Sequence, residues 1–212
     1  MAAVPDHIRD PAEIYRQSFE TIRREADLSR FSNGLEDIAV RLIHACGMID
    51  IVDDLVIRGD AAEAGKAALR QGRPIVCDVE MVRNGIIRRL LPDGLPVLCG
   101  LSDKRTESLA AELGTTRSAA AFEVLSQEIA GGIVVVGNAP TALFHLLEMI
   151  GQGAEPPALI VGIPVGFVGA AESKDALIEN SGNTPFVTVR GRRGGSAMAA
   201  AVVNAIAGGL VA

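Results

Sequence analysis

The sequence predicts a doubly wound α/β domain, in which helices cover both faces of a mostly parallel sheet of about five strands. Short apolar runs rich in β-branched residues lack polar alternation, which is typical of strands buried on both faces. From residue 73 onward these runs alternate with helical stretches, as in βαβ units. The chain has 212 residues, 49% of them hydrophobic and 22% charged, which suits one domain with a buried core. We therefore predict a single domain over residues 1–212.

Two amphipathic helices are predicted before the sheet. Asp10 is a typical N-cap, Pro11 suits the first helical position, and Glu13 stands at the capping-box position. The residues that then share one helical face are Tyr15, Ser18, Phe19 and Ile22.

The second helical pattern starts near Leu35 and continues to Ile49. On this helix Arg41 and His44 are three residues apart and share a side away from the apolar stripe. Both side chains are therefore expected to be available to solvent, a pocket or a partner chain.

The predicted strands are 74–77, 96–99, 133–136, 159–161 and 186–189. The helices between and after them are predicted within 107–113, 119–129, 141–150 and 174–180. The Ala- and Gly-rich stretch 196–212 is predicted as a terminal helix packed on the body of the protein, because it is shorter than a membrane span. Ligands of such sheets bind at the carboxyl ends of the strands.

Composition excludes several classes of function. Twenty Lys and Arg against 26 Asp and Glu give a net charge of −6, which does not favour nucleic acid or an anionic membrane surface. Aromatic residues make up only 3%, too few for base-stacking platforms. The three cysteines form no CxxC pair, and the acidic N-terminal region is no signal peptide, so a reducing cytoplasm is expected.

The loops after the predicted strands are rich in glycine. None matches GxGxxG, a P-loop or a GxSxG nucleophile elbow, so nucleotide binding and a hydrolase triad are disfavoured. Residues 180–212 contain no Asp or Glu but three Arg, namely Arg190, Arg192 and Arg193. This local excess predicts an anion, carboxylate or phosphate, at a strand end; salt bridges within the fold are the alternative.

Histidine is the ordinary acid–base group near neutral pH. His7 is expected at the surface and His145 within a packed helix, which leaves His44 as the functional candidate, with a structural role as its alternative. No histidine, cysteine or acid stands at convincing metal-ligand spacing, and Asp78-x-Glu80 is interpreted as a feature of a βα loop. No protein-bound metal is predicted.

Eight sequence strings together resemble the precorrin-8X methylmutases over nearly the whole chain. They are SF at 18–19, EADLSRF at 25–31, HACG at 44–47, TRSAAA at 116–121, GNAPTALF at 137–144, PVGFVGAAESK at 164–174, RGR at 190–192 and GGSAM at 194–198. Only the termini and residues 53–69 are freely variable.

The resemblance implies a flavodoxin-like three-layer fold, a homodimer and an isomerase without a cofactor. Its reaction would move the methyl group on C-11 of precorrin-8X to C-12 and give hydrogenobyrinic acid, a step of cobalamin biosynthesis. His44 matches the family's histidine and would donate and retrieve the proton that activates the conjugated ring. A metal, in relatives that act on a cobalt-containing substrate, would belong to that substrate.

The substrate implied by the resemblance carries many carboxylates, and the remaining candidates are assigned to its binding. Arg117 is the first candidate for a carboxylate clamp, and the other candidates are Arg41, Arg190, Arg192, Ser18, Tyr15, Asn138 and Lys174. For Tyr15 helix packing is an equal alternative. A non-catalytic tetrapyrrole carrier, which would need the pocket but not His44, is the main alternative function, and a flavin- or nucleotide-binding module is the other.

Overall fold

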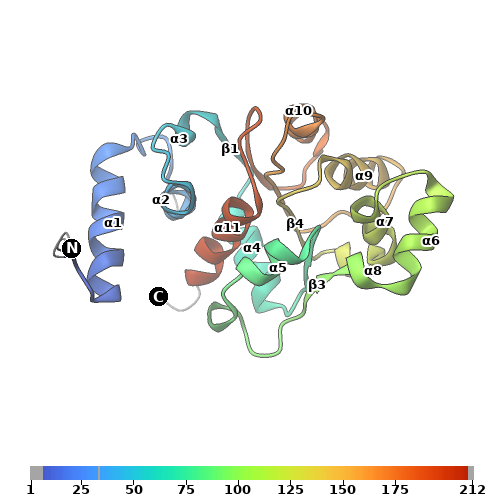
Figure 1. Cartoon of the computed structure of the whole chain (residues 1–212), viewed down its shortest axis with the longest axis horizontal. Coiled ribbons are helices and arrows are strands. Elements are labelled where there is room, and N and C mark those ends of the chain that lie inside the picture. Colours follow the sequence, from blue (N-terminus) through green and yellow to red (C-terminus); the bar gives the residue numbers. More distant parts are fainter. Residues whose placement is uncertain (1–6, 33, 210–212) are drawn as a thin grey trace, which may run out of the picture.

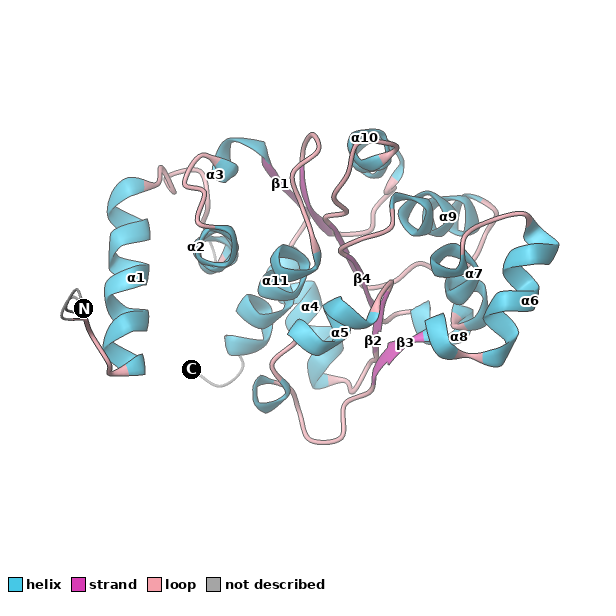
Figure 2. Ribbon diagram, in the orientation of Figure 1, coloured by secondary structure: helices cyan, strands magenta, loops and turns pink. Residues whose placement is uncertain are grey.

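The computed structural model describes residues 7–32 and 34–209. Its sheet contains the strands β1 (Leu55–Arg58), β2 (Ile75–Cys77), β3 (Val97–Cys99), β4 (Ile133–Val136), β5 (Leu159–Gly162) and β6 (Phe186–Val189) in the order β1-β6-β5-β4-β2-β3 (Figure 2). Strands β2 to β6 are parallel. Their order, β3-β2-β4-β5-β6, is the flavodoxin-like order. Both the five parallel strands and the flavodoxin-like class are confirmed.

Strand β1 is a sixth, antiparallel strand that the sequence analysis did not predict. It pairs with β6 at the edge of the sheet, from Leu55 opposite Val189 to Arg58 opposite Phe186. Only Leu55 of its four residues is buried. Such a short, half-exposed edge strand carries too little periodicity to be detected.

The helices form layers on both faces of the sheet (Figure 1). One face is covered by α2 (Leu35–Cys46), α3 (Ile51–Asp54), α4 (Ala61–Arg70), α5 (Glu80–Gly85) and α11 (Ser196–Gly208). The other is covered by α7 (Arg117–Val124), α8 (Ser126–Ile129), α9 (Pro140–Gly151) and α10 (Ala170–Asn180). Helix α1 (Pro11–Glu25) packs outside α2, and α6 (Lys104–Leu113) packs against α7.

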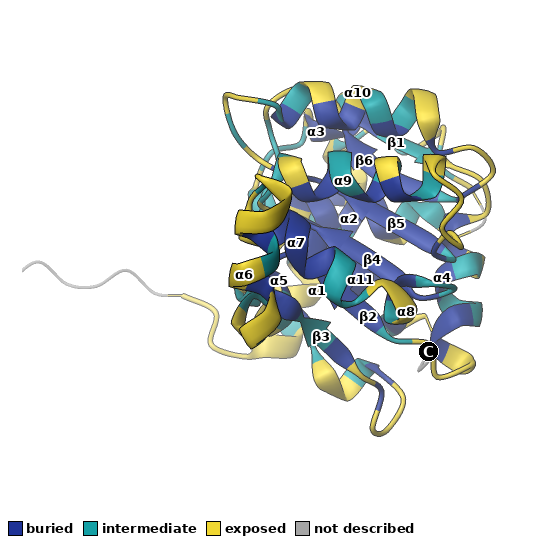
Figure 3. Cartoon of the chain, turned by 90° about the vertical axis from the view of Figure 1, so that its right-hand side faces the viewer, coloured by how far each residue is buried: buried dark blue, intermediate teal, exposed yellow. Residues whose placement is uncertain are grey.

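Apolar side chains alternate between two cores along each parallel strand. In β4, Ile133 and Val135 belong to the core under α2 and α11, whereas Val134 and Val136 belong to the core under α7 and α9. Figure 3 shows the central strands buried between these layers. Complete burial of such a side chain stabilises the fold by about 1.5–3 kcal/mol, so the sheet provides a rigid base for the loops at its carboxyl edge.

The N-terminal helices agree with the sequence prediction in outline. The Asp10 side chain accepts a hydrogen bond from the backbone N–H of Ala12, and Pro11 opens α1. The predicted capping box is not formed, because the Glu13 carboxylate contacts Arg16 and Gln17 instead. Helix α2 ends at Cys46, earlier than predicted, because Gly47 adopts a left-handed φ of 70° that terminates the helix.

Two further predictions concern the C-terminal half. The predicted helix 119–129 is two helices, α7 and α8, separated at Leu125. The terminal helix is confirmed as α11, and residues 210–212 of that prediction lie outside the described part of the chain. Short 3₁₀ turns occur at Arg88–Leu90 and Gly100–Ser102. None of the helices in the described ranges has the length and apolar character of a membrane span.

Candidate active site

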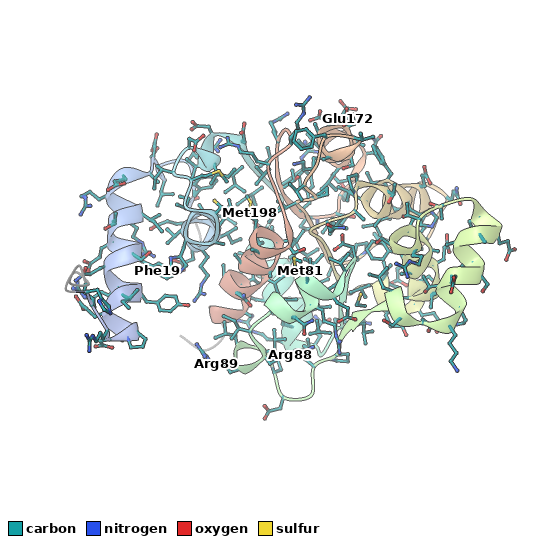
Figure 4. The ribbon with its side chains drawn as sticks, in the orientation of Figure 1. Phe19, Met81, Arg88, Arg89, Glu172 and Met198 are labelled. Atoms are coloured by element: carbon teal, nitrogen blue, oxygen red, sulfur yellow. The ribbon has the colours of Figure 1, made fainter. Side chains whose placement is uncertain are left out.

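His44 lies in the last turn of α2 and faces α1. The Oγ of Ser18 lies 2.8 Å from its Nδ1. The rings of Tyr15 and Phe19 contact the imidazole, each with its centroid 5.3 Å from that of His44. Positions 15, 18 and 19 share one helical face, as the sequence predicted, and Figure 4 shows Phe19 on the side of α1 turned toward α2. This face therefore fixes the orientation of the imidazole.

The contact with Ser18 determines which ring nitrogen of His44 can exchange a proton. Within residues 7–32 and 34–209, Nε2 of His44 has no hydrogen-bond partner, whereas Nδ1 is bound to Ser18. A serine hydroxyl can donate to a neutral ring and can accept from a protonated one. Ser18 can thus hold Nδ1 in both states.

A pocket of about 380 Å³ lies beside His44, between α1 and the end of α2. Its walls combine the apolar side chains of Ile22, Ile43 and Ile49 with the polar ones of Thr21 and Glu25. Ligand pockets range from about 300 to 1,000 Å³, so this one can hold part of a large ligand. His44 is solvent-exposed at its mouth.

Arg41 and His44 lie on the same side of α2 but line different pockets. Its guanidinium carbon is 5.7 Å from the centre of the Phe19 ring, the ring that also contacts His44. Arg41 lines a hollow of about 200 Å³ together with Arg23 and Gly208. Phe19 therefore stands between the two predicted site residues.

Arg117 and Asn138 form a second group, after strands β3 and β4. Both are exposed, Arg117 as the first residue of α7 and Asn138 in the loop that leads into α9. The loops are joined by Thr116, whose Oγ1 lies 2.8 Å from that of Thr141. This group belongs to the helical layer opposite α1 and α2 (Figure 1), so one chain does not bring Arg117 beside His44.

Arg190 and Arg192 form a third group, in the loop after β6. Both are exposed; the Arg190 guanidinium lies 4.0 Å from Asp175, and that of Arg192 lies 5.5 Å from the centre of the Phe167 ring. Arg193 is neutralised by Asp50 and Asp54, at 2.7 and 2.5 Å. Two of the three predicted arginines thus remain accessible to an anion.

Lys174, on α10, is bonded to the backbone of this loop. The side chain is fully buried, and its Nζ donates a hydrogen bond of 2.7 Å to the backbone oxygen of Arg193. Burial lowers the pKa of Lys174 to about 8, an effect that the carboxylates of Asp175 and Asp54 oppose. Lys174 was predicted to contact the substrate, but its ammonium group is not exposed in this chain.

Two features at the same edge were not predicted as parts of the site. Phe167 and Val168 are 85% and 89% exposed, and an apolar pair between Gly166 and Gly169 was the available signal. Asp78 is a fully buried carboxylate after β2, bonded to three backbone N–H groups of the next loop. The sequence placed Asp78 in a βα loop, as the structure does, but did not indicate its hydrogen bonds to the neighbouring loop.

The structure indicates neither an activated thiol nor a group of metal ligands within the described ranges. Burial raises the pKa of the Cys77 thiol and that of Cys99, the latter to about 11, so neither thiol is an activated nucleophile. Within the described ranges, His, Cys, Asp and Glu side chains form no group of three that could hold a metal ion.

The protein is thus a flavodoxin-like α/β protein. Its site combines a histidine that has an available ring nitrogen beside a pocket with arginines at strand ends, and this combination suits proton exchange with an anionic ligand. The family model described as precorrin-8X methylmutase matches residues 13–208. The chain belongs to the precorrin-8X methylmutase family and is an isomerase of cobalamin biosynthesis.

Relatives and solved structures agree with this assignment. Proteins named precorrin-8X methylmutase from a Sinorhizobium species and from Pseudomonas aeruginosa are each 57% identical over 95% of this chain and cover 96% and 97% of their own lengths. A cobalt-precorrin-8 methylmutase from Salmonella typhimurium is 41% identical over 94% of the chain and 96% of its own length. The structure of precorrin-8X methylmutase from Thermus thermophilus superposes with a TM-score of 0.83 at 35% identity, covering 92% of this chain and 94% of that one.

Proposed function

We propose that this protein converts precorrin-8X into hydrogenobyrinic acid by moving the methyl group on C-11 of the macrocycle to C-12, with His44 as the proton donor and acceptor. The observation that carries the proposal is the geometry of His44: Ser18 holds Nδ1, and Nε2 is left available beside the pocket. Membership of a methylmutase family supplies the reaction class.

The reaction needs one positioned acid and no nucleophile. A proton from Nε2 of His44 enters the conjugated ring system and makes the carbon next to C-11 electron-poor. The methyl group then migrates with its bonding electrons, so that the bond to C-11 breaks as the bond to C-12 forms. Loss of one proton to Nε2 completes the isomerisation. General acid catalysis of this kind contributes roughly 10²–10⁴-fold, and a fixed substrate geometry supplies further acceleration.

The carboxylates at the rim of the macrocycle explain the accessible arginines. Arg117, Arg190 and Arg192 are exposed at the carboxyl edge of the sheet, and guanidinium groups bind carboxylates in a planar, bidentate manner. Phe167 and Val168 offer an apolar surface beside Arg192, which suits a flat ring bordered by carboxylates. In this proposal Tyr15 and Asn138 contact the substrate, and Arg41 binds a more distant carboxylate.

We further propose that the substrate is free of cobalt. The two relatives at 57% identity carry the name precorrin-8X methylmutase, whereas the Salmonella typhimurium relative named for the cobalt-containing substrate is 41% identical. No protein-bound cofactor takes part in the proposed reaction.

A homodimer is also part of the proposal. The pocket beside His44 is smaller than a macrocycle of four rings with its side chains, and Arg117 lies in the opposite helical layer. A second copy of the chain would supply the missing wall and carboxylate contacts.

The position of the methyl group in the product tests the proposal directly. Precorrin-8X carrying a ¹³C label in the C-11 methyl group is incubated with the protein, and the product is examined by ¹³C NMR. We expect the labelled carbon to appear bonded to C-12, at the same rate as the optical change. A bound but unaltered macrocycle would identify a carrier protein instead and would overturn the proposal.

A further inference from the structure

Asp78 occupies the point where the strand order of the sheet reverses. It follows β2, its carboxylate is fully buried, and it bonds to the loop after the neighbouring strand β4. Its Oδ1 accepts from the N–H of Gly137 at 3.0 Å. Its Oδ2 accepts from the N–H groups of Asn138 and Ala139 at 2.8 and 2.7 Å. Sheets of this class bind their ligands at such a switch point.

Three successive N–H groups that converge on one point form an anion-binding nest. Here the chain's own carboxylate fills the nest, so this crevice is closed to the phosphate of a nucleotide or flavin. The loop is also pressed against its neighbours: a Cβ atom at Gly137 would lie 2.6 Å from the Val82 side chain and 2.8 Å from the backbone of Ser196. The hydrogen bonds to Asp78 and the close packing at Gly137 thus both hold this loop.

This loop is connected to two predicted substrate contacts. Asn138 is part of the loop, and Arg117 is connected to it through a pair of threonine hydroxyl groups. Asn138 is itself exposed and donates its backbone N–H to Asp78. Thr141 follows in the first turn of α9, and its hydroxyl meets that of Thr116, 2.8 Å away. Thr116 caps α7 and immediately precedes Arg117. The Asp78 carboxylate is thus linked to both Asn138 and Arg117.

We propose that Asp78 is a positioning residue, which sets Asn138 and Arg117 to receive the carboxylates of the substrate. The proposal rests on the proposed function, because it assumes that these two side chains bind the macrocycle. Asp78 does not touch the substrate. It acts by holding the β4–α9 loop in the conformation in which Asn138 and Arg117 can bind the substrate.

Removal and chemical replacement of the carboxylate provide the test. In Asp78→Gly the nest is vacant, and sodium formate offers a carboxylate small enough to bind the three N–H groups. We expect KM for precorrin-8X to rise on the order of tenfold or more, since misplaced contacts cost binding, with a smaller change in kcat. The Tm should fall as well, and formate should restore both KM and Tm relative to sodium chloride of equal ionic strength.

Asp103→Gly is the matched control. The Asp103 carboxylate also accepts a backbone N–H, that of Arg105 at the start of α6, but its side chain is 31% exposed. Water can satisfy that N–H group after the substitution, so formate should change neither Tm nor KM in this variant.

A second variant tests the link to Arg117 without disturbing the core. Thr141→Val keeps the shape of an exposed side chain and removes the contact with Thr116. We expect KM to rise while Tm stays at the parent value. In the Arg117→Ala background the same substitution should have no further effect on KM, because the two changes act through one contact.

The outcomes separate the two proposals. Restoration of Tm by formate without restoration of KM, or an unchanged KM in Thr141→Val, would overturn the positioning role. If formate changes neither KM nor Tm in folded Asp78→Gly, the three N–H groups do not act as a carboxylate-binding nest, and the proposal is overturned. Failure of the parent protein to convert precorrin-8X would overturn the proposed function, while the Tm response to formate would still report on the nest.

Discussion

The orientation of His44 depends on one hydroxyl group and two aromatic rings that α1 presents. Ser18 bonds to Nδ1, and Tyr15 and Phe19 pack against the imidazole. These residues precede His44 by 25 or more positions, so their contact with it follows from the packing of α1 on α2. The sequence indicated the helical face and the histidine. It could not indicate that the Ser18 hydroxyl bonds to the imidazole of His44.

This geometry predicts the effect of removing the Ser18 hydroxyl. In Ser18→Ala the imidazole loses one hydrogen bond, with a net value of about 0.5–1.5 kcal/mol. We expect kcat to fall by roughly two- to thirteenfold while KM stays close to the parent value. Steady-state kinetics of the purified variant measures both constants.

Ser18→Thr is the matched control, because threonine retains a hydroxyl at the same carbon, and its kcat should remain near that of the parent. A rise in KM in Ser18→Ala without a loss of kcat would instead assign Ser18 to the substrate rim, the role predicted from the sequence.

Among the elements, the strands with strong apolar patterns were predicted to within one residue at each end. The edge strand β1 was not, because only one of its residues is buried. The loops were located by their glycines, but their contacts were not. Arg193 was grouped with the unopposed arginines, yet it is paired with Asp50 and Asp54, which lie some 140 positions earlier in the chain.

Lys174 on α10 links the stability of the fold to pH. Burial lowers its pKa from 10.5 to about 8 in the folded chain. Between these values the unfolded chain binds more protons at this site than the folded chain does, so the stability contribution of Lys174 rises with pH. Below about pH 8 both states are protonated, and the folded state bears the cost of a buried charge.

The difference in Tm between the parent and Lys174→Met isolates this effect. Between pH 8 and 10 we expect the parent to gain stability relative to the variant, because methionine carries no titratable group. Thermal denaturation of both proteins across this interval gives the comparison. Two curves that remain parallel would show that Lys174 is not titrating over this range.

At the scale of the whole molecule, the flavodoxin-like layers separate residues that the sequence motifs grouped together. His44 lies between α1 and α2, whereas Arg117 starts α7 on the opposite face of the sheet (Figure 1). A sequence motif does not show where its residues lie relative to one another in the fold. The apolar runs predicted five of the strands and helices on both faces of the sheet, and the family resemblance predicted the flavodoxin-like class. The strand order and the distribution of the candidate site residues over the surface required the fold.

The proposed role of His44 in the proton transfer of the isomerisation can be tested by an optical time course with precorrin-8X. The parent protein, His44→Ala and His145→Ala are compared under identical conditions. His145 is the control histidine, because it lies on α9 and bonds to Glu123, 2.9 Å away.

We predict that the parent and His145→Ala convert the spectrum of precorrin-8X into that of hydrogenobyrinic acid. His44→Ala should bind the macrocycle but turn it over at least about 10²-fold more slowly, the minimum expected for loss of general acid catalysis. Turnover by His44→Ala within a few fold of the parent would show that His44 does not transfer the proton.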